Sequence, residues 1–551
     1  MKIVKKIVFG LVILAVIIIL FFVVKRIYNN WIKQNLKSKT WISEHVALSK
    51  SEYGNAIYTI SKNKNISIFN SLYQEVVNEK INEMNIQKNT FKTPLIIYNP
   101  YGTNKLSFNI YFNTDEESKL VYKISVDGYE DFSSELNNEE ENNLTKEHSY
   151  QLIGFIPGEI NHLSLVLKNK NDDIIDEQTI DIDMTSIKTN VSTQLEVFGE
   201  GKLSNGLFAM LGHDKNYNAN TYLYDNNGIL RSELVLDSYR SDRIIFDGTD
   251  MIYSYSKSGF IRVDRTGMIT QKYDIDGYTM HHDYVYDDNS NKLVILANKN
   301  GADTIEDRVI SLDLDTGKVK EVLNMMDFLE EMYDKAISPG KNTYGGYELD
   351  WIHLNSLQVV NSKDIILSSR ELNSIIYIEN FYTNPQLKYI IADSEFYDDT
   401  IYQSYLLQSD GEFNKNVGQH SIVYSKGDDG KYYIELFNNY FGKSRTRPDF
   451  KFNNFDNIGT YEEGEYSYYQ KYEVDEENNS YKLVNEIKIP YSSIVSGVIS
   501  LDNNIITSSG MSYCFDEYDS DNNLLKEFKY TSKKYAYRVY KYSFDNWFNN
   551  N

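Results

Sequence analysis

The side chains best suited to chemistry in this sequence are four histidines and one arginine, which occur in three similar stretches. His281 and His282 lie in the first stretch, His353 in the second and His420 in the third. In each stretch, turn-forming residues and then an apolar run follow the histidine, which is typical of a β-hairpin. Arg370 ends the hairpin of the second stretch. The sequence therefore predicts one local arrangement that is repeated three times, with a histidine at its opening.

These residue types favour a site for an anion. An imidazole can act as nucleophile or proton carrier near neutral pH, and a guanidinium presents a planar fork of donors to a tetrahedral oxyanion. If the repeats are blades of a radial β structure, equivalent positions point toward one axis. His282, His353 and His420 are equivalent on this alignment. We therefore expect three imidazoles and the guanidinium of Arg370 to converge on a single anion.

Two other chemistries fit this sequence less well. Three imidazoles form a known catalytic zinc set, but Arg370 beside them would repel a divalent cation. The sequence supports acyl transfer by a Ser/His/Asp triad even less, because it has no Gly-x-Ser-x-Gly nucleophile turn. We therefore expect neither a metal nor an organic cofactor.

At these residues the sequence resembles the bacterial arylsulfate sulfotransferases that do not use the nucleotide sulfate donor. The resemblance covers roughly residues 90–545. The motifs that carry it are His281-His282-Asp283, Trp351-Ile352-His353-Leu354-Asn355-Ser356 with Ser368-Ser369-Arg370, and Gly418-Gln419-His420. The resemblance implies that His420 is the nucleophile, which takes the sulfuryl group as a transient sulfohistidine. It also implies that His282, His353 and Arg370 hold the sulfate oxygens, with Asn355 in support.

The activity that this resemblance implies is transfer of a sulfuryl group from an aryl sulfate donor to a phenol acceptor. A covalent intermediate on the enzyme would give ping-pong kinetics, and neither metal nor nucleotide is required. His281 stays a second candidate for substrate binding, because the preference for His282 depends on the repeat alignment. Family members can be dimers, so a homodimer is a further expectation. The alternative function is a non-catalytic extracellular β-propeller that binds a surface ligand or a protein partner.

Composition indicates the class of fold that must position these residues. The 551 residues include 47 tyrosines but only 7 prolines, and short runs of Tyr, Ile and Val alternate with Asn, Asp and Gly, which is typical of an all-β protein. A formal net charge of −23 opposes binding of nucleic acid, which needs a basic surface. The single cysteine, Cys514, excludes an intramolecular disulfide.

The length predicts more than one domain, and we divide the chain into four parts. Residues 1–26 contain an apolar run from Ile7 to Val24 between basic residues, which predicts an uncleaved transmembrane signal anchor. This anchor would place the protein in the cell membrane as a single-pass protein with its catalytic domain outside the cytoplasm. The remaining parts are a partly helical linker (27–90), a small β-sandwich domain (91–187) and a β-propeller (188–545). Six Asp- or Asn-rich turns in the last part predict six blades.

Overall fold

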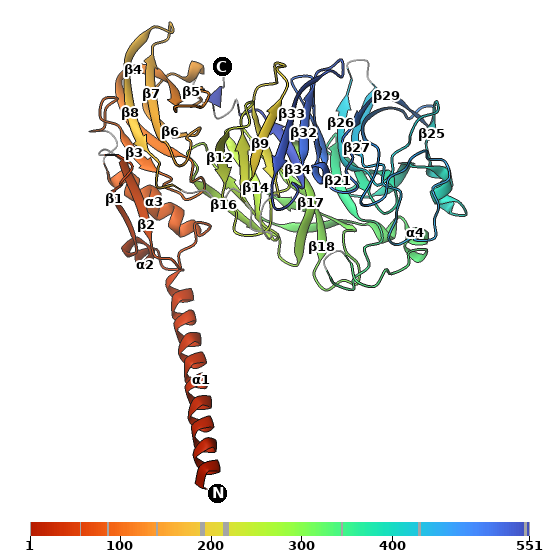
Figure 1. Ribbon diagram of the computed structural model, residues 1–551, viewed down its shortest axis with the longest axis horizontal. Helices are drawn as coiled ribbons and strands as arrows, with labels where there is room; N and C mark the ends of the chain where they lie inside the picture. Colours follow the sequence, from red (N-terminus) through yellow and green to blue (C-terminus); the bar gives the residue numbers. More distant parts are fainter. Residues whose placement is uncertain are drawn as a thin grey trace.

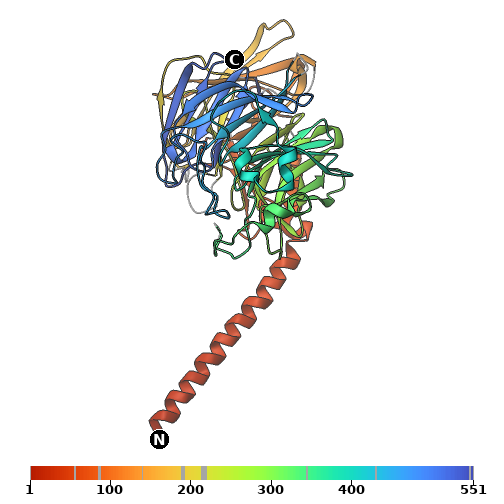
Figure 2. The same ribbon diagram turned by 90° about the vertical axis from the view of Figure 1, so that its right-hand side faces the viewer.

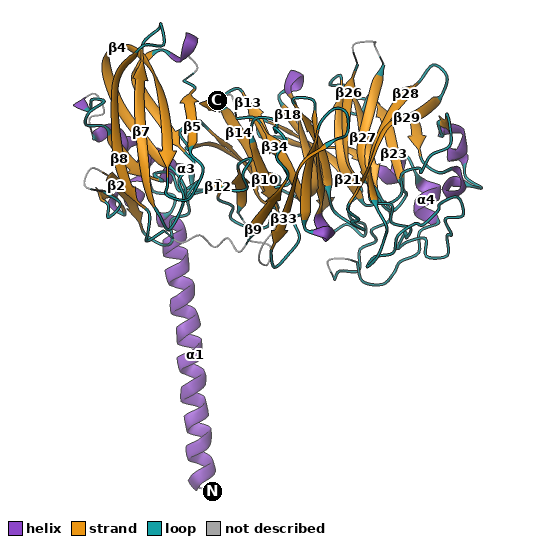
Figure 3. Cartoon of the chain, turned by 45° about the horizontal axis from the view of Figure 1, so that its top comes forward, coloured by secondary structure: helices purple, strands orange, loops and turns teal. Residues whose placement is uncertain are grey.

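The computed structural model of the chain describes most of the sequence. It describes residues 2–54, 57–84, 88–138, 141–187, 193–212, 220–342, 345–427, 431–544 and 548–549, and residues outside these ranges are grey in Figure 3. Side chains of residues 2–13, 15, 141, 194 and 548–549 lie outside this description.

The chain begins with a long helix, α1 (Lys2–Asn35), which projects away from the rest of the molecule in Figure 1. The predicted apolar run of residues 7–24 lies within α1, although the side chains of its first part are outside the described residues. Apolar side chains of its second part, such as Ile19 and Phe22, are largely exposed. Among the described residues, no helix combines the length and the apolarity that a membrane crossing needs.

The segment after α1 belongs to the first β domain, because two of its strands join the sheet of that domain. The segment contains α2 (Lys39–Glu44), β1 (Val46–Lys50), β2 (Ile57–Lys62) and α3 (Ser71–Glu83). β2 pairs in parallel with β3 (Leu95–Tyr98). Tyr73, Val76, Val77 and Ile81 lie on the buried face of α3. Asn70 caps that helix by accepting from the amide of Leu72 at 3.0 Å. The partly helical linker predicted for residues 27–90 therefore contains sheet as well as helix.

The long strand β4 (Phe108–Ser125) organises the first β domain. Its first half pairs with β3 and with β6 (Thr145–Leu152), whereas its second half pairs with β5 (Phe132–Leu136) and with β7 (Ile160–Lys168). β8 (Ile174–Asp183) pairs with β7. Alternate residues of β7 are buried, which is the pattern of a strand with one face on a core. This arrangement confirms a β domain ahead of the propeller.

Six sheets follow and form the predicted six-bladed β-propeller (Figure 1). Blade 1 contains β10 (Leu207–Leu211), β11 (Thr221–Tyr224) and β12 (Leu230–Leu234), and blade 2 contains β13 (Ile244–Asp247), β14 (Asp250–Ser256), β15 (Gly259–Val263) and β16 (Ile269–Asp274). Blade 3 contains β17 (Tyr278–Asp287), β18 (Lys292–Lys299), β19 (Arg308–Asp313) and β20 (Val319–Asn324), and blade 4 contains β21 (Leu354–Val360), β22 (Asp364–Ser369), β23 (Ser374–Glu379) and β24 (Gln386–Ile391). Blade 5 contains β25 (Gln408–Ser409), β26 (His420–Lys426), β27 (Tyr432–Asn438), β28 (Ser467–Asp475) and β29 (Ser480–Ile489), and blade 6 contains β30 (Gly497–Leu501), β31 (Asn504–Ser509), β32 (Cys514–Tyr518) and β33 (Leu524–Thr531).

Both ends of the propeller segment close the ring. β34 (Arg538–Tyr542), from the end of the chain, pairs with β10 and becomes the first strand of blade 1. β9 (Gln194–Phe198), from the start of the segment, pairs with β33 and becomes the last strand of blade 6. Blade 1 and blade 6 are therefore both made from distant parts of the sequence, which the sequence pattern did not predict.

The first β domain packs against blades 1 and 2 (Figure 1), and Figure 2 shows that α1 projects away from both domains. Arg231 of blade 1 donates to the carbonyls of Gly154 and Glu130 at 3.1 and 2.6 Å. Arg265 of blade 2 donates to the carbonyl of Ser149 at 2.8 Å. β35 (Phe548–Asn549), which follows the propeller, pairs with β5 of the first domain.

Insertions between strands cover the propeller near blades 4 and 5. The insertion between β20 and β21 contains a 3₁₀ turn, Met325–Asp327, followed by the short helix α4 (Glu330–Asp334). The loop between β27 and β28 meets this insertion, since the amide of Ile337 donates to the carbonyl of Thr446 at 2.8 Å.

Candidate functional site

Bulges in three inner strands place the candidate residues. β17, β21 and β26 are the innermost strands of blades 3, 4 and 5, and their register with the neighbouring strand shifts near His282, His353 and His420. His282 and His353 have positive φ angles of 60° and 51°, which few non-glycine residues adopt. In blade 5 the positive φ, 55°, belongs to Ser421, one residue after His420. The three loops are therefore similar but not residue-for-residue equivalent.

His353 lies between two buried carboxylates. Its Nδ1 contacts Asp350 Oδ2 at 2.7 Å and forms a shorter ion pair with Glu306 Oε2. Burial and the charge of Arg370 both disfavour the charged imidazole, but Asp350 and Glu306 outweigh them and raise the pKa of His353 to about 9. His353 is therefore an imidazolium at neutral pH. Among the described residues, its Nε2 has no hydrogen-bond partner.

Arg370 is held by the acidic residue next to it. Its Nη2 donates to Glu371 Oε1 at 2.7 Å and lies 3.7 Å from Asp350 Oδ2. The other oxygen of Glu371 accepts from Ser444 Oγ at 2.9 Å and from the amide of Arg445 at 2.6 Å. Glu371 therefore fixes the guanidinium and also anchors the loop that covers blade 5.

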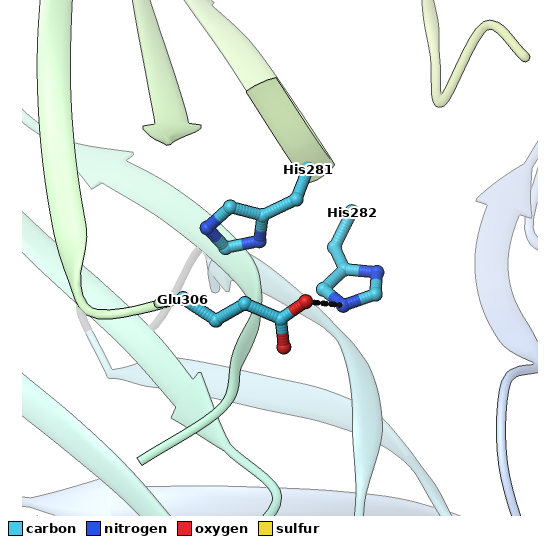
Figure 4. Close-up of side chains that lie close together, drawn as sticks. All are labelled: His281, His282 and Glu306. Carbon is cyan, nitrogen blue, oxygen red and sulfur yellow. Dashed lines mark hydrogen bonds and ion pairs between the residues drawn. The ribbon is translucent and has the colours of Figure 1, made fainter. Parts of the chain in front are cut away.

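His282 lies against His353 and shares Glu306 with it. The centroids of the His282 and His353 rings are 4.9 Å apart. His282 Nε2 donates to Glu306 Oε1 at 3.1 Å, as Figure 4 shows. Arg240 Nη2 donates to His282 Nδ1 at 3.3 Å, which assigns the proton of the neutral ring to Nε2. Burial lowers the pKa of His282 to about 4. His282 is therefore a neutral imidazole beside a charged one.

His420 has an amide partner in place of a carboxylate. Its Nδ1 contacts Asn439 Oδ1 at 2.8 Å. The Nδ2 of Asn439 donates to the carbonyls of Ser492 and Val495 at 2.7 and 3.2 Å, so the Asn439 oxygen must face His420. His420 Nδ1 therefore carries the proton, and Nε2 carries the lone pair. Burial, Arg370 and His353 together hold the pKa of His420 well below its usual value.

Asn355 and Arg538 tie the blades together beneath these side chains. Asn355 Nδ2 donates to the carbonyl of Gln419 at 2.8 Å, and its buried Oδ1 has no partner among the described residues. Arg538, fully buried on the closing strand β34, donates to the carbonyls of His282 and Asn355 at 3.1 and 2.6 Å. One guanidinium thus joins blades 1, 3 and 4 at the candidate site.

His281 lies beside this cluster and also lines a separate cavity. Its ring packs edge-on against His282, with centroids 5.1 Å apart (Figure 4). The same ring lines a cavity of about 350 Å³ at the side of blade 3.

The structure brings together His282, His353 and Arg370, and the charges of Arg370 and His353 act on His420. The sequence reasoning missed the groups that set their protonation, namely Glu306, Asp350, Glu371, Asn439 and Arg538. Asp350 and Glu371 could have been found from their positions, three residues before His353 and one after Arg370. Glu306, Asn439 and Arg538 come from other strands or blades, so no local pattern marks them.

Two sets of these residues could hold a metal ion. They are His281, His282 and Glu306, and Glu306, Asp350 and His353, and within each set the possible ligand atoms lie within 4.8 Å of one another. Arg240 Nη2 lies 3.3 Å from His282 Nδ1, and Arg370 Nη2 lies 3.7 Å from Asp350 Oδ2. These guanidinium charges disfavour a divalent cation at either set.

Fold and site together define a six-bladed β-propeller with a buried cluster of imidazoles and guanidinium groups at the start of its inner strands. A family model described as "Arylsulfotransferase (ASST)" matches residues 194–545, and one described as "Arylsulfotransferase Ig-like domain" matches residues 95–185. The chain belongs to the arylsulfotransferase family, which indicates a sulfotransferase enzyme. The family does not favour the alternative of a non-catalytic propeller.

Comparison with individual proteins adds little to this assignment. No curated protein matches the chain. Among solved structures, a streptogramin B lyase is 10% identical, with a TM-score of 0.30 over 62% of this chain and 88% of the lyase. A nidogen/laminin complex is 8% identical, with a TM-score of 0.35 over 61% and 97% of the two chains. A virginiamycin B lyase from Staphylococcus aureus is 10% identical, with a TM-score of 0.29 over 62% and 99%. These likenesses say nothing about the chemistry of this chain.

Proposed function

We propose that this protein moves a sulfuryl group from a phenolic sulfate ester to a phenolic acceptor, in two steps through a sulfohistidine at His420. The observation that carries the proposal is the fixed tautomer of His420. Asn439 holds the proton on Nδ1, so the Nε2 lone pair is available beside the positive charges of Arg370 and His353. Family membership supports the sulfotransferase class.

In the first step, His420 Nε2 attacks the sulfur of the donor in line with the aryl oxygen. The N–S bond forms as the S–O bond to the aryl group breaks. The His353 imidazolium gives its Nε2 proton to the departing phenolate, which leaves as the phenol. Asp350 and Glu306 are positioning residues in this step, because they keep His353 charged before the transfer.

In the second step, the phenol acceptor attacks the same sulfur, the N–S bond breaks and the new S–O bond forms. His353, which is now neutral, accepts the phenolic proton and returns to the imidazolium. His420 regains its lone pair on Nε2. Both half-reactions use one acid–base group in opposite directions, and atoms and charges balance without a cofactor.

The sulfuryl oxygens need donors while charge spreads over them in a loose transition state. We assign these donors to Arg370 and His282, while His353 contributes its positive charge. Asn355 supports the site by donating from Nδ2 to the carbonyl of Gln419, next to His420. His282 Nε2 donates to Glu306 in the structure, so we propose that this N–H turns to a sulfuryl oxygen when the donor binds. His282 rather than His281 fits this role because its ring lies against that of His353.

The experiment that tests the proposal mixes the protein with p-nitrophenyl sulfate in the absence of an acceptor. We expect a burst of nitrophenol equal to the enzyme concentration, and a mass increase of one SO₃ group on the peptide that contains His420. Added phenol should then restore continuous turnover and remove the label. Continuous release without an acceptor would indicate a sulfatase, and the absence of any release would count against this activity.

We also propose that α1 anchors the protein in the cell membrane, with the propeller outside the cytoplasm. The apolar run of residues 7–24 and the exposed apolar side chains in its second part support this proposal. Cell fractionation tests the anchoring, and recovery of the protein in the soluble fraction would contradict it. Protease treatment of intact cells tests the location of the propeller, and protection from protease would contradict a location outside the cytoplasm. A homodimer stays a prediction, which light scattering on detergent-purified protein measures.

A further inference from the structure

The cavity beside His281 adjoins the catalytic cluster at three points of the chain. Three pairs of sequence neighbours form this boundary: Tyr239 and Arg240, His281 and His282, and Ile305 and Glu306. The first member of each pair lines the cavity. The second member interacts in the cluster around His282. The cavity is therefore the compartment next to the proposed reaction site.

His281 is the anomaly in this compartment. Its side chain is only 2% exposed, and neither ring nitrogen has a hydrogen-bond partner among the described residues. A buried polar group without a partner is costly, and native proteins rarely leave one unpaired. Burial lowers the pKa of His281 to about 3, so the ring is neutral and offers one donor and one acceptor. A ligand that pairs with both kinds of group would remove the cost.

Charged groups of both signs lie around the cavity, which argues against a charged ligand. Lys299 pairs with Glu321 at 3.3 Å, and Lys257 lies over the ring of Tyr239 at 4.6 Å. The carboxylate of Glu348 accepts from Asn342 at 3.1 Å. The lining contains cationic groups from Lys257 and Lys299 and a carboxylate from Glu348, and Asn298, Asn300 and Thr279 add neutral polar groups.

We propose that this cavity binds the hydroxyl-bearing part of the phenol acceptor, a neutral group with neighbouring hydroxyls that pair with His281. A hydroxyl both donates and accepts, so it satisfies the ring in either tautomer, whereas a carbonyl or an ammonium group satisfies only one. Figure 4 shows the ring of His281 beside Glu306 and His282, so an acceptor held there lies next to the ring that we assign to a sulfuryl oxygen, His282. This inference rests on the proposed sulfuryl transfer for the identity of the ligand as an acceptor.

Two sources could supply such hydroxyls, and the experiment separates them. With p-nitrophenyl sulfate as donor, kcat/KM is measured for phenol, for catechol and for 4-hydroxyphenyl β-glucoside. We expect at least one of the two hydroxylated acceptors to exceed phenol by about tenfold in the wild-type protein. Catechol alone would assign the cavity to a ring hydroxyl, and the glucoside alone would assign it to sugar hydroxyls. Equal values for all three acceptors would overturn the proposal.

Variants of His281 test whether this preference arises in the cavity. His281→Phe fills a similar space without a donor or acceptor, so the advantage over phenol should fall to about one. His281→Gln keeps both kinds of group and should retain part of the advantage. The control is His162→Phe, because His162 is a partly exposed histidine paired with Asp181 on the first β domain. A preference that survives His281→Phe would contradict the proposal.

A binding measurement separates failure of this inference from failure of the proposed reaction. Isothermal titration of the preferred acceptor into His420→Ala and into His420→Ala/His281→Phe needs no turnover. About tenfold weaker binding by the double variant supports the cavity as the acceptor site. Equal affinity rejects the cavity even where sulfuryl transfer is observed. Failure of the reaction itself is diagnosed separately, by wild-type protein that transfers sulfate to none of the three acceptors.

Discussion

The neighbouring blades 4 and 5 each place one deeply buried imidazole in the site, and the two imidazoles have opposite proton states. His353 is 3% exposed and His420 is 2% exposed. His353 has carboxylate partners and a pKa raised to about 9, whereas His420 has an amide partner and a pKa well below its usual value. Burial alone would make both rings neutral. The difference teaches that the charge of the partner, and not the depth of the side chain, divides the proposed roles of acid and nucleophile.

The largest effect should follow removal of the nucleophile. We expect His420→Ala to lower kcat by at least about 10³-fold, because no other group would then form the covalent intermediate. Stopped-flow measurement of the nitrophenol burst checks this, and the burst should vanish. The matched control is His162→Ala, which removes a partly exposed imidazole from the first β domain and should leave the burst intact. A burst that persists in His420→Ala would show that another residue is the nucleophile.

The next largest effect should follow loss of the acid in blade 4. We expect His353→Asn to lower kcat by about 10²-fold for sulfates of weakly acidic phenols, because their phenolates need a proton to leave. The loss should be smaller for p-nitrophenyl sulfate, whose leaving group is stable without protonation. A series of aryl sulfates with graded leaving-group acidity measures this. Equal losses across the series would show that His353 does not act as the acid.

A smaller effect should follow when the partner of His420 is made to resemble that of His353. Asn439→Asp places a carboxylate beside His420, which favours the imidazolium and raises the pKa of His420. The nucleophile is lost below that pKa, so the acidic limb of kcat/KM for the donor should move to higher pH. If the limb moves by about one pH unit, activity at a fixed pH on that limb falls about tenfold. Asn439→Ser, which adds no charge, is the control, and an unmoved limb in Asn439→Asp would contradict the assignment.

The smallest effect should follow the converse change. Asp350→Asn removes one carboxylate from His353 and leaves Glu306, so the pKa of His353 should fall from about 9. The acid is lost as pH rises through its pKa, so the alkaline limb of kcat/KM for the donor should move to lower pH. At pH 7 we expect a loss of only about two- to threefold. Measuring kcat/KM for the donor from pH 5 to pH 10 tests this prediction. The alkaline limb must move in Asp350→Asn while the acidic limb stays in place.

The sequence predicted the fold class, because alternating strands and turns report the local chain directly. It did not predict how the ring closes, since β9 and β34 join blades at the opposite end of the segment. Nor did it predict that β1 and β2 pair with the sheet of the first β domain. Pairing between distant strands depends on register and core packing, which the local pattern of apolar residues does not contain.

Part of the candidate site was also predictable from the sequence. The repeated hairpins identified histidines that the structure places at bulges in neighbouring inner strands. The proton states were not predictable, because the partners of His353 and His420 include Glu306 and Asn439, which lie far from them in the sequence. The sequence could not separate the role of His281 from that of His282, because a one-residue change at a bulge turns a side chain to the other compartment.

The placement of Arg538 has a consequence for biosynthesis. Arg538 lies on β34, the last propeller strand, and donates to the carbonyls of His282 and Asn355. During translation, all the histidines of the site are therefore synthesised before Arg538. We expect a nascent or prematurely terminated chain to be inert toward sulfate esters, since the ring and the reactive centre would be completed by the same final strand. Sulfotransferase activity would thus require translation to the end of the propeller. Measuring the nitrophenol burst of chains truncated before and after β34 tests this expectation.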